Sequence, residues 1–205
     1  FDAAMQSQRT RARKANKFSH SDDLSIKVQT ASSFVGYEYS KDNAEIKELF
    51  FEGKTTTSLA KNQHGILITD NTPFYAESGG QVGDIGQIES KDGSFRVTDT
   101  QKQAKTTIHH GFMEVGELKI SDNVVMKIDH ERRSNIAANH SATHLMHAAL
   151  RNVLGDQVTQ KGSLVDENRL RFDFSYNKPL SKSDLFDIEV QVNNEIRKNY
   201  VSKTT

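Results

Sequence analysis

The spacing of hydrophobic and polar positions divides the chain into three zones with different predicted structure. Residues 1–19 are basic and lack Gly and Pro, which predicts a helix with either a solvated or a phosphate-contacting face. Between 20 and 128, short alternating runs separated by Gly, Asp and Asn recur at intervals of about ten residues. The clearest runs contain Leu24, Ile26, Val28, Ile66, Leu67, Ile68, Thr69, Phe95, Val97, Thr98, Val124, Val125, Met126 and Ile128. This zone predicts an antiparallel β-barrel or sandwich.

The third zone, residues 129–205, has the order helix, hairpin, helix. Asp129 is suited to cap the start of a long helix, and Gly155 to follow its end. Strands are expected over 158–165 and 169–176, and Ser181 or Ser183 is suited to cap a final helix. The predicted fold class is therefore α+β: a short N-terminal helix, an antiparallel β-barrel subdomain, and a helix-hairpin-helix unit.

Composition excludes several classes of protein. The 205 residues carry 27 Lys+Arg and 27 Asp+Glu, a formal net charge of +0, which excludes a polyelectrolyte tail but permits local basic patches. With 0 Cys, the chain forms no disulfide and no thiolate zinc site by itself. No run approaches the length of a membrane span, so we expect a cytoplasmic protein with no membrane partner. Because residue 1 is Phe rather than Met, we expect a piece of a longer protein.

The segment 139–147, Asn-His-Ser-Ala-Thr-His-Leu-Met-His, carries the most informative chemistry. On a helix, His140, His144 and His147 fall within roughly 60° of one another, Thr143 borders this stripe, and the apolar residues lie opposite. These apolar residues are Ala138, Ala142, Leu145, Met146 and Ala149. Histidines four positions apart can present their nitrogens to one metal ion, or simply lie in solvent.

Two further segments are candidates for binding. Residues 72–86 contain Gly79, Gly80, Gly83 and Gly86, which predicts either a bulged strand or a surface where a ligand or a second backbone comes close. The segment matches neither a phosphate-binding loop nor a dinucleotide fingerprint. Gln160, followed by Lys-Gly, lies either on a plain edge strand or in a cleft beside the histidine helix.

Taken together, four segments resemble bacterial alanyl-tRNA synthetases, in the same order along nearly the whole chain. They are residues 1–15, the Phe-Tyr-Ala-Glu-Ser-Gly-Gly-Gln-Val-Gly-Asp run at 74–84, and residues 139–150 and 160–175. The resemblance implies that 1–19 end the tRNA-recognition region, 20–128 form a β-barrel subdomain with a glycine motif, and 129–205 begin the editing core. Such an enzyme is a ligase that charges tRNA with alanine, and its editing domain hydrolyses mischarged Ser-tRNA(Ala) and Gly-tRNA(Ala).

The resemblance also implies roles for individual residues. His140 and His144 match two zinc ligands of the family, and Thr143 and Gln160 match positions that recognise the amino-acid part of the substrate. Gly79, Gly80, Gly83 and Asp84 match the glycine motif, which lies close to the editing core. There is a physical reason for a separate editing site. A binding pocket for alanine distinguishes Ser or Gly from Ala by only a small difference in binding free energy.

One departure limits what the resemblance implies for this chain. The family completes its zinc shell with a later Cys-x-x-x-His segment, which is not among these 205 residues. We therefore expect half of a Zn²⁺ site here, with weak zinc binding and no hydrolysis by this chain alone. ATP and Mg²⁺ would belong to an aminoacylation domain that the chain lacks.

The expected partner is tRNA(Ala), especially its aminoacylated 3′ end, and full-length synthetases can form homo-oligomers. Two other functions remain open from the sequence. One is a free-standing trans-editing alanyl-tRNA deacylase, against which the basic segment before the barrel argues. The other is a non-catalytic RNA-binding module that uses the barrel and scattered Arg and Lys side chains.

Overall fold

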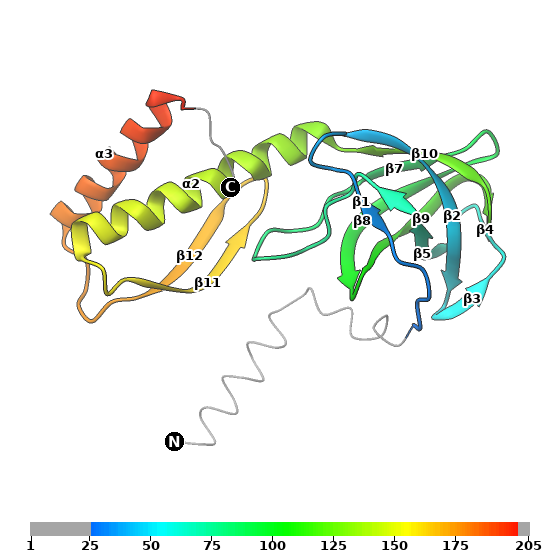
Figure 1. Cartoon of the computed structure of the whole chain (residues 1–205), viewed down its shortest axis with the longest axis horizontal. Coiled ribbons are helices and arrows are strands. Elements are labelled where there is room, and N and C mark those ends of the chain that lie inside the picture. Colours follow the sequence, from blue (N-terminus) through cyan, green and yellow to red (C-terminus); the bar gives the residue numbers. More distant parts are fainter. Residues whose placement is uncertain (1–25, 201–205) are drawn as a thin grey trace, which may run out of the picture.

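The computed structural model describes residues 26–200, which form a barrel joined by a long helix to a smaller α/β unit (Figure 1). The predicted basic helix at 1–19 lies outside the described residues. In chain order the elements are β1 (Ser33–Phe34), β2 (Lys41–Phe51), β3 (Lys54–Thr56), β4 (Ser58–Ala60), β5 (His64–Thr69), β6 (Asn71–Thr72), β7 (Gly86–Glu89), β8 (Gly93–Gln103), β9 (Thr106–Lys119), β10 (Asn123–Ile128), α2 (His130–Leu154), β11 (Thr159–Val165), β12 (Leu170–Ser175) and α3 (Lys182–Lys198).

The first unit is a closed antiparallel barrel, as one of the two sequence alternatives predicted. Its six strands follow the order β10-β7-β8-β9-β5-β2, and β2 pairs with β10 to close the ring. Alternate side chains of each strand point inward, so Phe95 and Val97 of β8 and Val124 and Met126 of β10 are buried in one core. Closure removes the free sheet edges that an open arrangement would expose.

The segment 26–32 corrects one prediction, because it forms no strand although Ile26 and Val28 alternate with polar residues. Instead, Ile26 is buried in a second cluster on the barrel wall, with Phe50, Ile66, Ile68 and Ile108. The backbone N–H groups of Gln29 and Thr30 donate to the carboxylate of Glu48 at 2.9 and 2.7 Å. The alternating apolar residues of this segment therefore pack on the barrel without forming a strand. The Glu48 carboxylate, and not a neighbouring strand, accepts the hydrogen bonds of these two N–H groups.

Two of the long strands, β2 and β9, are not evident from the hydrophobic pattern. The pairing of β2 with β5 shifts register between Ile46 and Glu48. The pairing of β9 with β8 also shifts register. A bulge shifts the side chains that follow to the opposite face, so inward and outward positions cease to alternate strictly. The barrel therefore contains more regular strand than the simple alternating runs predict.

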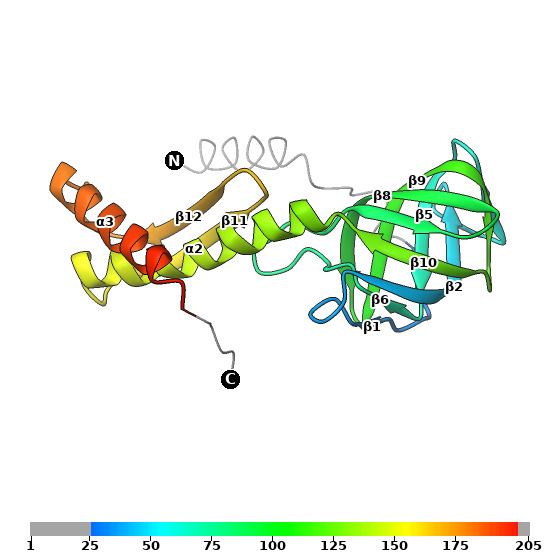
Figure 2. The ribbon, with the colours of Figure 1, turned by 90° about the horizontal axis from the view of Figure 1, so that it is seen from above.

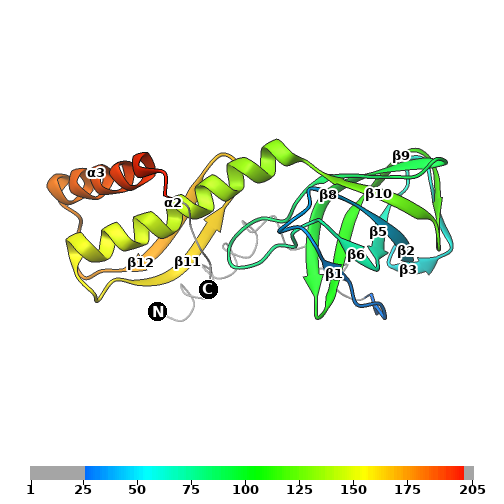
Figure 3. The ribbon, with the colours of Figure 1, turned by 45° about the horizontal axis from the view of Figure 1, so that its top comes forward.

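The second unit follows the predicted order of helix, hairpin and helix. The carboxylate of Asp129 accepts from Arg132 N at the start of α2, which begins directly after β10 and leads away from the barrel (Figure 2). Gly155 follows the end of α2, as predicted, and Ser181 rather than Ser183 caps α3 in a complete capping box with Asp184. In Figure 3, α3 and the β11–β12 hairpin lie on either side of α2.

The packing face of α2 matches the predicted one in part: Met146 and Ala149 belong to the core of the second unit, but the earlier positions differ. Ala138 is exposed and Ala142 is partly exposed, whereas Ile136, Thr143 and Leu150 are buried. The reason is that the helix contacts different partners along its length: its first half faces the glycine motif and the hairpin, and its second half also packs against α3. Ala149, Leu150 and Leu154 share a core there with Ile188 of α3 and Phe172 and Phe174 of β12. Neither helix within residues 26–200 is both long and apolar enough to span a membrane.

Candidate functional site

The glycine motif forms a tight hairpin that reaches from the barrel toward β11 (Figure 1). Ser78 and Gln81 pair through N–H···O bonds of 3.2 and 3.0 Å, with Gly79 and Gly80 between them at φ values of 62° and 85°. Two successive positive φ angles are the pattern of a two-residue turn that glycine adopts without steric cost. The sequence left open a bulged strand or a surface that a ligand or a second backbone approaches closely. The structure shows the close approach of a second backbone.

The backbone that comes close to the motif belongs to β11 and to the barrel. A Cβ atom at Gly80 would lie 2.4 Å from the carbonyl oxygen of Ser163, and one at Gly83 would lie 2.2 Å from that of Thr100. Beyond the turn, Val82 N donates to Val165 O at 3.1 Å, and Val165 N donates to Gly80 O at 2.7 Å. The motif therefore docks on the hairpin of the second unit.

Asp84, the last predicted motif residue, is a structural anchor rather than an open ligand-binding group. It is 2% exposed and accepts from Tyr75 N at 2.8 Å and from Arg133 Nε at 2.9 Å. The same guanidinium donates to the carbonyl oxygens of Gly36 and Pro73 at 3.0 and 3.1 Å. A buried carboxylate paired in this way fixes the start of α2 against the barrel.

His140 and His144 come together on α2, as their spacing predicts. Their ring centroids lie 5.1 Å apart and the ring planes differ by 20°, so the two imidazoles are stacked. His140 is half-buried and His144 is exposed. Burial lowers the pKa of His140, and the nearby His144 lowers it further. Both effects favour the neutral imidazole, which is the form that accepts a proton or binds a metal ion.

Gln81 positions one of these rings, a role that the sequence did not reveal. Its side chain is 7% exposed, and its Oε1 lies 2.6 Å from Nδ1 of His140. Because an amide oxygen only accepts, Nδ1 carries the proton and donates, and Nε2 is left with the free lone pair. The position of Gln81 between Gly80 and Gly83 could have drawn attention to it. Nothing in the sequence, however, shows that this hairpin brings the Gln81 side chain to α2.

Thr143 lies between the two histidines along the helix and is 6% exposed. Its hydroxyl donates to the carbonyl oxygen of Asn139 at 2.8 Å, one helical turn earlier. With its proton used in this way, the hydroxyl oxygen keeps lone pairs and can act only as an acceptor. Any ligand group that it recognises must therefore be a donor.

Gln160 lies on β11 directly opposite Phe174 of β12. Directly opposed residues of an antiparallel pair point to the same face of the sheet. Phe174 packs into the core shared by α2 and α3, so Gln160 is on the hairpin face that looks toward the helix. Its side chain is exposed. The structure thus places Gln160 on the face beside α2, and it lines none of the three cavities described below.

His147 belongs to the predicted histidine stripe but not to the stacked pair. Its ring lies 5.0 Å from that of Phe172, and its Nε2 atom is buried without a hydrogen-bond partner in the described part of the chain. The third histidine is therefore directed toward the hairpin, where an apolar ring covers it.

The donor set fits half of a zinc site. Protein-bound Zn²⁺ takes four N, S or O donors in a tetrahedral arrangement. The α2 pair supplies two imidazoles, and residues 26–200 contain no group of three or more His, Cys, Asp or Glu side chains arranged to hold a metal ion. Two more donors would have to come from elsewhere.

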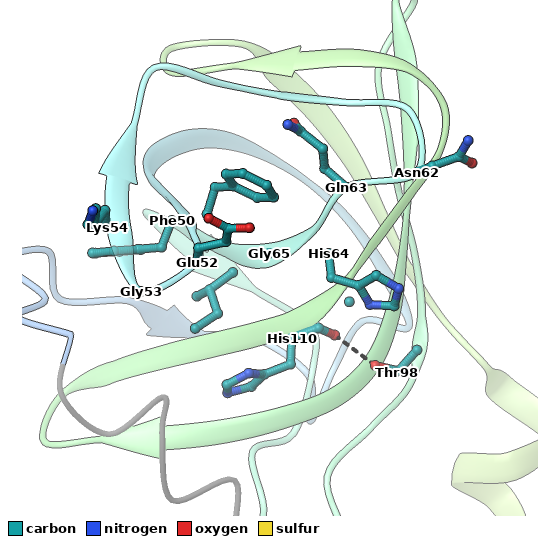
Figure 4. A pocket seen from close by; sticks show the side chains of 13 residues that line it. Phe50, Glu52, Gly53, Lys54, Asn62, Gln63, His64, Gly65, Thr98 and His110 are labelled. Atoms are coloured by element: carbon teal, nitrogen blue, oxygen red, sulfur yellow. Dashed lines mark hydrogen bonds between the residues drawn. The ribbon is translucent and has the colours of Figure 1, made fainter.

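Neither of two cavities in the structure is lined by the stacked histidines. The first lies in the barrel, and the second lies where the barrel meets the second unit. One of about 810 Å³ is lined by residues of several barrel strands, among them Lys54, His64 and His110 (Figure 4), and includes none of the predicted site residues. Another, of about 470 Å³, lies between Gly83, Arg132 and the turn of the hairpin. At its wall, Arg132 donates to Gly83 O at 2.8 Å and pairs with Glu167 at 3.2 Å.

Comparison with known families identifies the first two thirds of the chain. Residues 1–132 match the family described as tRNA synthetases class II (A). The match includes the barrel and the whole glycine motif, and it ends in the first turn of α2, before His140. It agrees with the resemblance to alanyl-tRNA synthetases and implies a ligase with tRNA as its partner. Since the match covers more than half of the 205 residues, the chain belongs to the class II (A) tRNA synthetase family.

Proposed function

We propose that this chain is part of an alanyl-tRNA synthetase and carries part of its editing site, which hydrolyses Ser-tRNA(Ala) and Gly-tRNA(Ala). The observation that supports the proposal is the stacked pair His140–His144, whose first ring is held by Gln81 of the glycine motif. Family membership rests on the barrel and the motif. The histidine pair lies on the next element, directly beside that motif.

In the proposed mechanism, the residues of α2 bind and orient the aminoacyl end. The Thr143 oxygen, left as an acceptor, accepts a hydrogen bond from the hydroxyl of a mischarged serine, a group that alanine lacks. Gln160, on the facing side of the hairpin, offers an amide that can donate to or accept from the amino-acid part. This hydrogen bond separates serine from alanine; glycine also lacks the hydroxyl and is not recognised through it.

Zinc would be held by Nε2 of His140 and by His144, together with a Cys and a His from a Cys-x-x-x-His segment outside this chain. When bound, the ion supplies a positive charge that polarises the ester carbonyl or lowers the pKa of a water. Gln81 keeps Nδ1 of His140 protonated, so that Nε2 is available as the ligand atom. We further propose that the protein acts in the cytoplasm.

The test measures deacylation of Ser-tRNA(Ala) by the full synthetase with His144→Ala. We expect hydrolysis to fall by about a hundredfold or more, because a ligand to the catalytic ion is lost, while alanine charging is unchanged. His130→Ala is the matched control, since this histidine is also exposed on α2 but lies in its first turn.

Full hydrolysis by the His144→Ala variant would overturn the assignment. A wild-type synthetase that binds tRNA but hydrolyses no mischarged ester would instead support the RNA-binding module. We also expect chain 1–205 alone to retain no zinc through dialysis, measured by metal analysis, because it supplies only two imidazoles. One tightly held zinc per chain would contradict the half-site.

A further inference from the structure

A third cavity, of about 450 Å³, lies on the barrel beside the glycine hairpin. Its walls come from the segment at 31–37, the segment at 75–78 and the tip of the β8–β9 hairpin. The lining residues that matter here are Phe34, Tyr37, Tyr75, Ser78, Lys102 and Lys105. We refer to it as the tyrosine–lysine cavity. Its volume lies within the usual range of small-ligand sites.

The aromatic residues of this cavity form a cluster around Phe34. Its ring lies 5.0 Å from Tyr37 and 6.0 Å from Tyr75, both edge to face. Tyr37 as a whole residue is 87% exposed. The loop that carries it is nevertheless fixed, because Arg133 donates to Gly36 O at 3.0 Å. An exposed aromatic ring on a fixed loop offers a flat surface on which another ring can stack.

The charge of the cavity has a single sign. Lys102 and Lys105 are exposed and flank the tip of the β8–β9 hairpin, where Ala104 adopts a φ of 54°. No Asp or Glu is among the described residues that line the cavity. Aromatic rings combined with cations are the usual means by which proteins bind unpaired nucleotides without reading their sequence.

The cavity is also close to the histidine pair. Ser78 lines the cavity, and its backbone forms two hydrogen bonds with the backbone of Gln81. The side chain of Gln81 in turn contacts His140. Paired residues of an antiparallel ladder have Cα atoms about 5.5 Å apart. One two-residue turn therefore separates a wall of the cavity from the residue that orients His140.

From these observations we propose that the tyrosine–lysine cavity binds an unpaired nucleotide of the tRNA, next to its esterified 3′ end. Tyr37 stacks on the base, and Lys102 and Lys105 contact the flanking phosphates. The proposal rests on the proposed editing function for the identity of the strand. It adds a binding surface on the barrel that holds the strand while its end lies at α2.

The test is binding of a short fluorescein-labelled single-stranded RNA ending in CCA to the full chain, by fluorescence anisotropy over a series of salt concentrations. Tyr37→Ala should weaken binding about fivefold to a hundredfold, the loss of one base–aromatic stack. Tyr37→Phe should bind like the wild type, because the ring is kept. Tyr200→Ala, which removes another strongly exposed tyrosine just after α3, should have no effect.

The lysines have a separate readout. Lys102→Ala with Lys105→Ala should make the slope of log affinity against log salt shallower by about 1.4, because two phosphate contacts to a single strand are lost. Lys54→Ala with Lys91→Ala removes the same charge from exposed barrel positions outside the cavity and should leave the slope nearly unchanged. Tyr37→Ala should leave it unchanged as well. Thermal unfolding confirms that each variant is folded.

Unchanged binding by the Tyr37→Ala and double-lysine variants would overturn the proposal, whatever the synthetase hydrolyses. Equal competition by duplex RNA or by an acidic peptide would overturn it too, because neither offers an unpaired base. If these variants lose RNA binding as expected while the synthetase shows no deacylation, the cavity stands and the proposed editing function fails. The two proposals are thus separable.

Discussion

At the scale of single residues, His109 is the clearest case of a titratable group fixed by its surroundings. It is fully buried on β9, where Nδ1 lies 2.9 Å from Leu67 O and Nε2 lies 2.8 Å from the Thr72 hydroxyl. The carbonyl can only accept, so Nδ1 carries the proton and Nε2 accepts from Thr72. Burial is the main cause that lowers the pKa of His109 to about 4.

This pKa predicts acid sensitivity. The unfolded chain, with an ordinary histidine pKa of 6.5, binds the proton before the folded protein does, so stability is lost as the pH falls from about 6.5 toward 4. Between about pH 7 and about pH 5, we expect a loss of about 2 kcal/mol from this residue. The measurement is urea unfolding at both pH values for the wild type and for His109→Gln, whose amide does not titrate. An equal pH dependence in both proteins would contradict the assignment.

At the scale of elements, the glycine hairpin shows two different reasons for glycine at adjacent positions. Gly79 has a φ of 62°, and a Cβ atom there would meet nothing within 4 Å beyond its chain neighbours, so this position requires only the backbone conformation. Gly80 has a φ of 85° and also lies against the carbonyl of Ser163 on β11. The first glycine shapes the turn, and the second allows the turn to dock.

Alanine at these two positions should therefore have unequal effects. Gly79→Ala should cost about 1 kcal/mol of unfolding free energy, since a non-glycine residue with positive φ is strained. Gly80→Ala adds a collision with backbone and should cost more. It should also speed hydrogen exchange at the Val82 and Val165 amides, which bond across this contact. Similar exchange rates in both variants would show that the docking is not tight.

At the scale of the whole molecule, Arg133 adds to the contacts by which the barrel and the second unit are joined, beside the docked glycine hairpin. Arg133, in the first turn of α2, bonds to Asp84 and to the backbone at Gly36 and Pro73, which come from separate barrel segments. The guanidinium has the several donors in a fixed plane that this arrangement needs. The direction of α2, and with it the position of His140, depends on this anchor.

Arg133→Ala should destabilise the protein by about 3 kcal/mol, because Asp84 is left buried without its partner. We expect thermal unfolding, followed by circular dichroism, to begin at a lower temperature and to broaden, because the barrel and the second unit keep the contacts of the glycine hairpin and Arg132 but lose those of Arg133. Arg151→Ala is the control on the same helix. Its partner Asp156 is highly exposed, and such surface pairs contribute little. An unshifted transition of unchanged width for Arg133→Ala would contradict the anchoring role.

Much of the secondary structure follows from local sequence. Asp129, Gly155 and Ser181 mark the ends of α2 and the start of α3 because capping is an interaction between near neighbours. The alternation in β10 and β12 predicts strands because a strand with one buried face has period two. The spacing of His140 and His144 alone brings their rings to one side of a helix.

Other features depend on contacts between distant segments. The alternation at Ile26 and Val28 predicts a strand, yet the free N–H groups that follow are satisfied by Glu48. Gln81 and His140 lie 59 positions apart, and only the docking of the glycine hairpin on β11 brings them together. The tyrosine–lysine cavity likewise combines three segments, none of which carries a motif for nucleotide binding.

The sequence by itself determined α2, the β11–β12 hairpin and α3 with their caps, the candidate histidines and the glycine motif, because each depends on residues within a few positions of one another. Only the tertiary structure decided that the strands close into a barrel, that α2 buries Thr143 rather than Ala138, and which residue orients His140. The physical reason is that the burial and the hydrogen-bond partners of a residue depend on which distant segment packs against it. The local spacing of residues does not specify that segment.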